Sequence, residues 1–111
     1  MKFSVLLPTR NRTDLALQAS QTVLRQDFDD WELIVSDNQS EGDLEGQLKA
    51  LGEPRIKYVR TTEVLPVTEN WNNALKHATG DYVVMLGDDD GLMKGCLRGL
   101  SELVARFQEP E

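Results

Sequence analysis

Three consecutive aspartates, Asp88, Asp89 and Asp90, lie between two glycines and directly follow the apolar run Tyr82–Leu86. Carboxylates this close repel one another, by roughly 3 kcal/mol for two charges about 5 Å apart at an effective dielectric constant of about 20. Such a cluster is tolerated when it is solvated, partly protonated or bound to a cation, and carboxylate oxygens suit Mg²⁺ or Mn²⁺. A solvated acidic loop that favours the start of the next helix is the alternative. The triplet alone leaves both readings open.

Two other polar segments also follow apolar runs. In Pro8–Arg12, the Thr9 hydroxyl and the backbone could contact a base or ribose, and the two arginines could face a phosphate or simply be exposed. In Ser36–Ser40, the Asp37 carboxylate could accept hydrogen bonds from a nucleobase or ribose, although Asp, Asn and Ser also form turns with their own backbone. Both segments are therefore candidate ligand contacts as well as ordinary turns.

The sequence contains neither G-x-G-x-x-G nor G-x-x-x-x-G-K-[ST], the glycine-rich patterns that commonly cradle phosphates. If the fold binds a diphosphate, another group must neutralise its charge. A divalent cation held by Asp88–Asp90 would do so.

The candidate residues depend on elements that the apolar pattern predicts. Short runs rich in Val, Ile and Leu indicate buried strands, at Phe3–Leu7, Leu33–Ser36, Ile56–Val59 and Tyr82–Leu86. The last run is apolar throughout, which is typical of a strand covered on both faces. Helical spacing of apolar residues follows each run, over Thr13–Gln26, Asp43–Leu51, Thr68–Ala78 and Met93–Phe107.

The strand–helix order, repeated four times, predicts an α/β fold with a mainly parallel sheet of about four strands and helices on both faces. Ligands of such sheets bind beyond the carboxyl ends of the strands, so the loops to search are 8–12, 37–42, 61–67 and 87–91. We expect the first helix to be capped by Thr13. The apolar faces should be Leu15, Ala19 and Val23 in the first helix, Trp71, Leu75 and Ala78 in the third, and Leu97, Leu100, Val104 and Phe107 in the fourth.

The chain has 111 residues, with 12 Lys or Arg against 19 Asp or Glu and a net charge of −7. This length fits one domain, which we assign to residues 1–108, with a frayed tail at 109–111. The acidic balance argues against a general nucleic-acid binder and against docking on an anionic membrane. One cysteine and one histidine exclude an internal disulfide and a clustered Cys/His metal site.

The first residues hold too few apolar side chains for a signal peptide. No stretch reaches the ~18 apolar residues of a membrane span. We therefore expect a soluble, cytoplasmic protein without a transmembrane segment.

Three stretches together resemble the N-terminal, nucleotide-binding half of the family 2 glycosyltransferases with the GT-A fold. They are SVLLPTRNR (4–12), WELIVSDNQS (31–40) and NWNNALKHATGDYVVMLGDDDGL (70–92), in the family's order and spacing. The resemblance implies a Rossmann-like, three-layer α/β/α fold. It also implies that the chain is a fragment of a larger glycosyltransferase.

The resemblance implies nucleotide contacts as well. The family's first segment lines the base and ribose pocket, and it falls here on Pro8, Thr9, Arg10 and Asn11. Arg10 stands where an aromatic residue is common. The second segment usually reads Asp-Asp-Gly-Ser in the family. Asp37 matches the carboxylate that contacts the base, while Asn38 and Gln39 are departures of smaller consequence.

The family's acidic Asp-X-Asp signature falls on Gly87, Asp88 and Asp89, so its first acid is missing. Asp89 then matches the main residue for the metal and diphosphate. Asp88 supports the ribose or the metal, and Asp90 is a weaker metal candidate. A literal Asp-X-Asp at Asp88 and Asp90 leaves the choice within the triplet open.

The family transfers a sugar from a nucleotide diphosphate sugar to an acceptor, commonly with inversion. The resemblance therefore implies a UDP, dTDP or GDP donor, a saccharide or other hydroxyl acceptor, and Mn²⁺ or Mg²⁺ to stabilise the leaving diphosphate. The carboxylate base lies downstream in the family. We expect it beyond residue 111, and little or no transfer by this chain alone.

Two alternatives stand beside this hypothesis. Val83–Gly91 loosely mimics the strand and DxDG signature of haloacid-dehalogenase phosphatases, with Asp88 as nucleophile and Asp90 as acid/base, but that signature normally starts a chain. A non-catalytic binding module on the same fold is the other. We also expect self-association, because part of the sheet or a helix face would otherwise stay uncovered.

Overall fold

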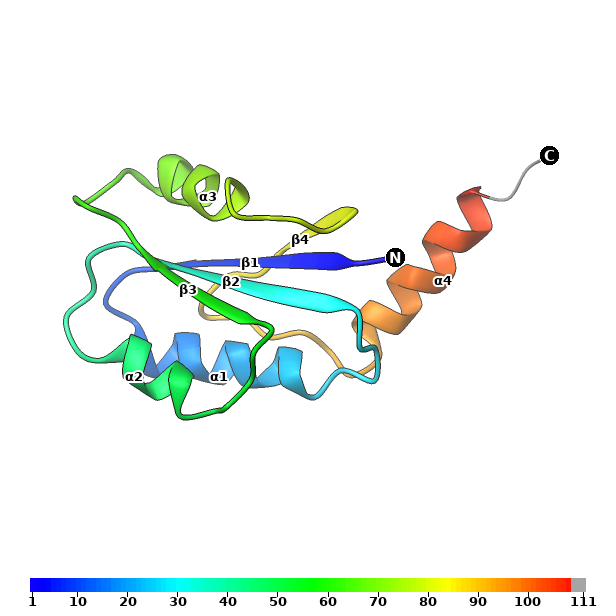
Figure 1. The fold of residues 1–111 in the computed structure, drawn as a ribbon, viewed down its shortest axis with the longest axis horizontal. Helices are drawn as coiled ribbons and strands as arrows, with labels where there is room; N and C mark the ends of the chain where they lie inside the picture. Colours follow the sequence, from blue (N-terminus) through cyan, green and yellow to red (C-terminus); the bar gives the residue numbers. More distant parts are fainter. Residues whose placement is uncertain (109–111) are drawn as a thin grey trace.

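The computed structural model describes residues 1–108, and the predicted tail at 109–111 lies outside the described residues. In this part of the chain, four strands form one parallel sheet in the order β3-β2-β1-β4, and each strand is followed by a helix (Figure 1). The elements are β1 (Phe3–Thr9), α1 (Thr13–Leu24), β2 (Trp31–Asp37), α2 (Leu44–Lys49), β3 (Ile56–Arg60), α3 (Val67–Leu75), β4 (Tyr82–Met85) and α4 (Cys96–Gln108). The predicted parallel α/β fold is confirmed. No described helix is long and apolar enough to cross a membrane.

The main core lies between the sheet and the helices α1 and α2, with α3 on the opposite face (Figure 1). Alternate residues of the two central strands point into this core, and they are Phe3, Val5, Leu7, Trp31, Leu33 and Val35. Leu6 and Ile34 point to the other face, where they pack with Ala74 of α3. The sheet is therefore the middle of three layers.

The buried face of α1 differs from the predicted one. The helix begins at Thr13 itself, with Arg12 in the capping position and no side-chain capping bond. Leu15 is 41% exposed. Ala19 and Val23 are buried as predicted, and Ala16 and Ser20 are buried beside them. Their small side chains let the helix pack closely on the sheet, so the buried face follows Ala and Ser rather than the largest apolar residues.

The predicted apolar faces of α3 and α4 are only partly buried. Leu75 in α3 is 47% exposed, because α3 turns Asn70 and Ala74 towards the sheet. In α4, Leu97 is buried but Phe107 is 79% exposed. Figure 1 shows α4 extending away from the sheet, which accounts for the exposure of its last turns.

β4 is an edge strand, and the predicted burial on both of its faces is wrong. Tyr82 and Val84 pack against the main core. Val83 and Met85 point to the other face and are 43% and 63% exposed. They stay uncovered because α3 packs on the two central strands, β1 and β2.

A buried carboxylate, Glu32, ties the amino end of the sheet together. Its Oε2 accepts hydrogen bonds from Ser4 Oγ at 2.5 Å and from the Thr79 backbone N–H at 2.6 Å. Its Oε1 accepts one from Lys57 Nζ at 2.6 Å, and Lys2 Nζ lies 3.4 Å away. Burial by itself raises the pKa of Glu32, but the bonds from Lys57, Ser4 and Thr79 outweigh it and lower that pKa to about 2. One charged group thereby joins three strands and the loop before β4.

This carboxylate should make the stability of the fold sensitive to acid. The pKa of Glu32 lies below its ordinary value of 4.5, so its contribution is complete above about pH 4.5 and is lost as the pH falls towards about 2. The shift corresponds to ~3 kcal/mol of unfolding free energy. Urea titrations followed by circular dichroism, at fixed ionic strength, measure this loss.

Two variants isolate the effect. Glu32→Gln should be less stable than the wild type at neutral pH and should lose this part of the acid dependence. Glu63→Gln, which changes an exposed carboxylate, should leave both properties unchanged. Wild-type acid dependence in Glu32→Gln would contradict the assignment.

Candidate functional site

A hollow of about 500 Å³ lies at the carboxyl edge of the sheet, where the loops after the four strands meet. Its walls come from these loops and from the first turns of α3. The lining residues are Pro8, Thr9, Arg10, Arg12, Asn38, Val64, Leu65, Pro66, Val67, Asn70, Trp71, Gly87 and Asp88. Ligands of parallel α/β sheets bind at this edge.

The hollow brings together half of the predicted site residues. Those that line it are Pro8, Thr9, Arg10 and Asp88. Those that lie outside its lining are Asn11, Asp37, Asp89 and Asp90. The sequence predicts the loop 61–67 as part of the site, because it follows a strand. It does not single out residues 64–67, because their side chains are mostly apolar.

The loop after β1 is bonded to the acidic loop after β4. Thr9 Oγ1 donates a hydrogen bond to Asp88 Oδ2 at 2.9 Å. Arg12 Nη1 lies 3.3 Å from Asp88 Oδ1 and 3.8 Å from Asp89 Oδ2. Two carboxylates of the triplet therefore converge on one cationic group supplied by the chain.

The donor set around Asp88 fits a divalent cation that also binds a ligand. The described residues contain no group of three or more His, Cys, Asp or Glu side chains that could hold a metal ion. Mg²⁺ commonly binds one or two carboxylates and takes its other ligands from water and substrate phosphates. Asp88 and Asp89 supply such a pair, and their placement around Arg12 shows that both can face a single positive charge.

Asp90 has a different place in this loop. Its backbone N–H donates to the Gly87 carbonyl at 3.0 Å, which closes a turn around Asp88 and Asp89. Its Oδ2 lies only 2.8 Å from where a β-carbon on residue 87 would stand. Glycine at position 87 therefore leaves room for the carboxylates.

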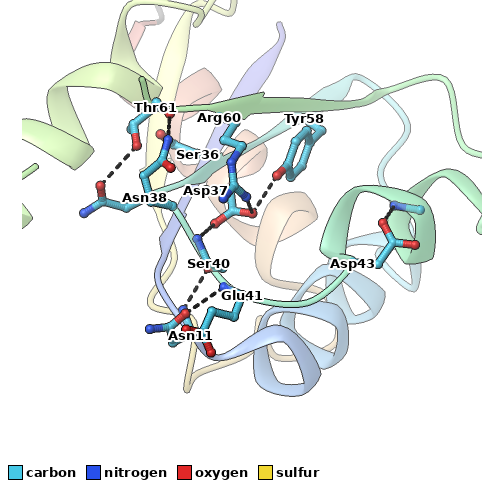
Figure 2. Close-up of polar contacts among 12 residues, drawn as sticks. Asn11, Ser36, Asp37, Asn38, Ser40, Glu41, Asp43, Tyr58, Arg60 and Thr61 are labelled. Atoms are coloured by element: carbon cyan, nitrogen blue, oxygen red, sulfur yellow. Dashed lines mark hydrogen bonds and ion pairs between the residues drawn. The ribbon is translucent and has the colours of Figure 1, made fainter. Parts of the chain in front are cut away.

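Asp37 is buried at the end of β2, with 1% of its surface exposed, and binds three donors of the chain (Figure 2). Its Oδ1 accepts from the Ser40 backbone N–H at 2.9 Å. Its Oδ2 accepts from the Tyr58 hydroxyl at 2.6 Å and from Arg60 Nη1 at 3.3 Å. Burial and the bond to Asp37 raise the pKa of Tyr58, so its hydroxyl keeps its proton. Asp37 therefore orders its own loop and the end of β3.

Asn38 and Gln39 bind the loop after β3, and both matter more than predicted. The Asn38 carboxamide contacts the Leu65 backbone and the Thr61 hydroxyl. Gln39 Nε2 donates to the Thr61 carbonyl. Gln39 also has a φ of 60°, in the left-handed region that favours glycine. The family pattern usually has glycine at this position, so Gln39 combines an unfavourable backbone with a contact that glycine cannot make.

Asparagines of α3 bind the side chain of Ser36, at the end of β2. Ser36 Oγ donates to Asn70 Oδ1 at 2.7 Å and accepts from Asn73 Nδ2 at 2.8 Å. Asn70 Nδ2 also donates to the Ser36 carbonyl at 3.3 Å. These bonds explain why a polar residue, Asn70, is buried beneath the hollow.

Asn11 joins the loops after β1 and β2 (Figure 2). Its backbone N–H donates to Ser40 Oγ at 2.8 Å, and its Oδ1 accepts from the Glu41 backbone N–H at 2.8 Å. Its φ is 55°, a left-handed conformation that asparagine tolerates better than most residues. Although Asn11 does not line the hollow, it fixes the relative position of two of its loops.

Comparison with known proteins gives a consistent result. The sequence model described as glycosyl transferase family 2 matches residues 4–110. A Campylobacter jejuni protein, GalNAc(5)-diNAcBac-PP-undecaprenol beta-1,3-glucosyltransferase, is 38% identical over 104 residues, which cover 91% of this chain and 34% of that protein. An Escherichia coli protein, UDP-Glc:alpha-D-GlcNAc-diphosphoundecaprenol beta-1,3-glucosyltransferase, is 28% identical over 87 residues, 78% of this chain and 34% of that one. The chain thus spans about a third of the length of these relatives.

Solved structures match in fold. TarS of S. aureus (residues 1–349), in complex with UDP-GlcNAc, superimposes with a TM-score of 0.87 and 25% identity, covering 96% of this chain and 32% of that one. A mannosyltransferase of Pyrobaculum calidifontis, in complex with GDP-Man and Mn²⁺, superimposes with a TM-score of 0.80 and 25% identity. The match covers 98% of this chain and 33% of that one. Both likenesses extend over nearly all of the present chain.

The left-handed backbone of Asn11 generates a stability prediction. Asn11→Ala should destabilise the fold, because it loses the bond from Glu41 while its β-carbon keeps the steric conflict of the left-handed conformation. Asn11→Gly loses the same bond without the steric conflict, so it should be more stable than Asn11→Ala by about 1 kcal/mol. Urea unfolding of both variants measures the difference. Equal stabilities would show that Asn11 does not hold this conformation in solution.

Proposed function

The chain belongs to glycosyl transferase family 2, and from this membership we propose that it is the donor-binding part of a glycosyltransferase. The hollow at the carboxyl edge takes a nucleotide diphosphate sugar. The observation that carries the proposal is the joint placement of Thr9, Arg12 and Asp88 at one end of that hollow. These residues offer a hydroxyl, a cation and a carboxylate to a ribose and diphosphate.

We assign the nucleobase and ribose of the donor to the side of the hollow formed by the loops after β1 and β2. The residues of this side are Pro8, Thr9, Arg10, Asn11 and Asp37. Thr9 and Arg10 line the hollow directly. Asn11 and Asp37 act through the loops that they order. The TarS structures contain UDP-GlcNAc or UDP and the mannosyltransferase structure contains GDP-Man. A UDP or GDP donor is in keeping with these neighbours, and dTDP is the third candidate.

We assign the diphosphate end to Asp88 and Asp89, with Asp90 in support. Asp88 and Asp89 would hold Mn²⁺ or Mg²⁺, which supplies positive charge to the leaving diphosphate when it is bound, and Asp90 closes the turn around them. Asp88 is oriented by its bond from Thr9. Arg12 is free to turn from the carboxylates towards a phosphate, because its side chain is 52% exposed.

The sugar passes, in this proposal, to the hydroxyl of a saccharide or another acceptor, with inversion. Among the described residues, Asp88 is the only carboxylate that lines the hollow, and it is committed to the diphosphate end. We therefore place the base that deprotonates the acceptor outside this chain. The chain alone should bind the donor and transfer little or no sugar.

The phosphatase alternative is set aside. The phosphatase signature normally starts a chain, whereas Val83–Gly91 includes the end of β4, the last strand of the described sheet along the chain. The family match is to glycosyltransferases. A non-catalytic module is distinguished from a donor domain by nucleotide binding.

A calorimetric titration with UDP, dTDP and GDP, each with and without Mn²⁺, tests the proposal. One nucleotide should bind in a metal-dependent manner. Asp89→Asn should weaken this binding by about tenfold or more, because a charged ligand of the cation is lost. Glu102→Gln, an exposed change on α4, is the control and should bind as the wild type does.

Two results would contradict the proposal. Absence of binding to all three nucleotides would favour a non-catalytic module. Wild-type affinity of Asp89→Asn in the presence of Mn²⁺ would remove that residue from the metal site.

We also propose that the isolated chain self-associates through β4. This strand pairs only with β1 in the described sheet, and Val83 and Met85 are exposed beside its open edge. Open apolar edges pair readily with other strands.

Sedimentation velocity over a range of concentrations tests this proposal. The sedimentation coefficient of the wild type should rise with concentration. Met85→Lys should remain monomeric, because a charged side chain at the edge opposes pairing. A wild-type chain that stays monomeric at the highest concentration would refute the proposal.

A further inference from the structure

We propose that Arg12 is the internal counter-ion of Asp88 and Asp89 in the free protein, and that a metal ion must displace it. The displaced guanidinium then binds a phosphate of the nucleotide, so binding of the metal and binding of the nucleotide depend on each other. The inference rests on the proposed function, because it states how the diphosphate end of the hollow favours a metal–nucleotide complex over the free metal ion.

The Arg12 guanidinium lies close to two carboxylates of the acidic loop. Its Nη1 is 3.3 Å from Asp88 Oδ1 and 3.8 Å from Asp89 Oδ2. Asp88 Oδ2 accepts a hydrogen bond from the Thr9 hydroxyl at 2.9 Å, so Oδ1 is the oxygen of Asp88 that is paired with the cation. A metal ion that binds both carboxylates would have a like charge beside it unless Arg12 moves away.

The balance of charges explains why Arg12 then needs a new partner. In the free protein, Arg12 partly neutralises two carboxylates that would otherwise repel each other. A divalent cation balances both carboxylates by itself, which leaves the guanidinium without a counter-ion. A diphosphate supplies one, because guanidinium groups pair well with phosphate oxygens. Arg12 and Asp88 line the same hollow, so a diphosphate held there has both groups on its walls.

The place of Arg12 in the fold lets its side chain move while its backbone stays fixed. Arg12 occupies the capping position of α1, where its carbonyl accepts a hydrogen bond from the Ala16 N–H at 2.8 Å. Its side chain is 52% exposed, whereas that of Asp88 is 14% exposed. The positive end of the helix dipole disfavours a cation at this position. The carboxylates offset that cost in the free protein, and a phosphate would offset it in the complex.

Arg12→Gln tests the competition with Mn²⁺ alone. Electron paramagnetic resonance of the free ion, recorded during a titration, gives the Mn²⁺ affinity of the site without any nucleotide. The variant should bind Mn²⁺ about fivefold more tightly than the wild type, because the competing charge is absent and the lost ion pair is largely exposed. Arg12→Lys keeps the charge, so it should bind Mn²⁺ about as weakly as the wild type does.

Calorimetry with nucleotide tests the transfer of Arg12 to the diphosphate. UDP, dTDP and GDP are titrated into each protein at the same excess of Mn²⁺. The nucleotide that the wild type binds should bind Arg12→Gln about tenfold more weakly, because a charge-assisted hydrogen bond to phosphate is lost. One substitution therefore moves the two affinities in opposite directions. A residue that only shaped the loop would lower both.

Arg25→Gln is the matched control. Arg25 is an exposed arginine at the other end of α1, and its side chain has no ion pair within the described part of the chain. Its variant has the same net charge as Arg12→Gln, so both of its affinities should equal those of the wild type. A gain of Mn²⁺ affinity in Arg25→Gln as large as that in Arg12→Gln would assign the effect to net charge and refute the competition.

Either of two further results overturns the proposal. Mn²⁺ affinity of Arg12→Gln that is no higher than that of the wild type, including absence of binding to both, shows that Arg12 does not compete with a metal ion. Nucleotide affinity that is unchanged or higher in Arg12→Gln shows that Arg12 does not bind the diphosphate. The Mn²⁺ titration uses no nucleotide, so it decides the competition even if the wild type binds none, a result that would count only against the proposed function.

Discussion

The carboxyl edge of this sheet depends on the side chains that directly follow β2. Beyond the strand ends, single backbone bonds join Asn38 to Thr9 and Thr61 to Asp37, and most of the remaining contacts between the loops come from side chains. β2 lies between β1 and β3, and its loop is therefore central. Asp37 binds the end of β3, Asn38 binds the loop beyond it, and Ser40 binds Asn11 after β1. These bonds therefore join the loops after β1, β2 and β3 to one another.

Although the chain is acidic, its less exposed carboxylates each have a lysine or arginine side chain nearby. Glu32 is met by Lys2 and Lys57 at the amino end of the sheet. At the other end, Arg60 approaches Asp37 and Arg12 approaches Asp88. The net charge of −7 is thus a property of the exposed surface, whereas each of these less exposed carboxylates has a cation within reach. The amino end is held by a charged network, and the ligand end is held largely by hydroxyls and amides.

The fold could be predicted because strand–helix alternation leaves a strong apolar signature, and all four predicted strands are present. The helix faces were harder to predict, since Ala16 and Ser20 are buried for their small size while Leu15 is not. Thr9, Arg10 and Asp88 could be predicted at the hollow because ligands collect at strand ends. The role of Asn38 could not, because its partner Leu65 is 27 residues away and offers only backbone groups. A contact to backbone groups leaves no motif in the sequence from which it could be predicted.

That contact also has a consequence for how the sequence can diverge. Both bonds from the Asn38 carboxamide reach the main chain of Leu65, so this attachment requires of residue 65 only a backbone N–H and carbonyl, which every residue except proline has. The outward side chains of the loop carry no part of the attachment. Descendants of this sequence can therefore exchange side chains that line the hollow while the backbone attachment of the loop stays in place. Substitution of Asn38 would break the attachment, whereas substitution of the outward side chains of the loop would not.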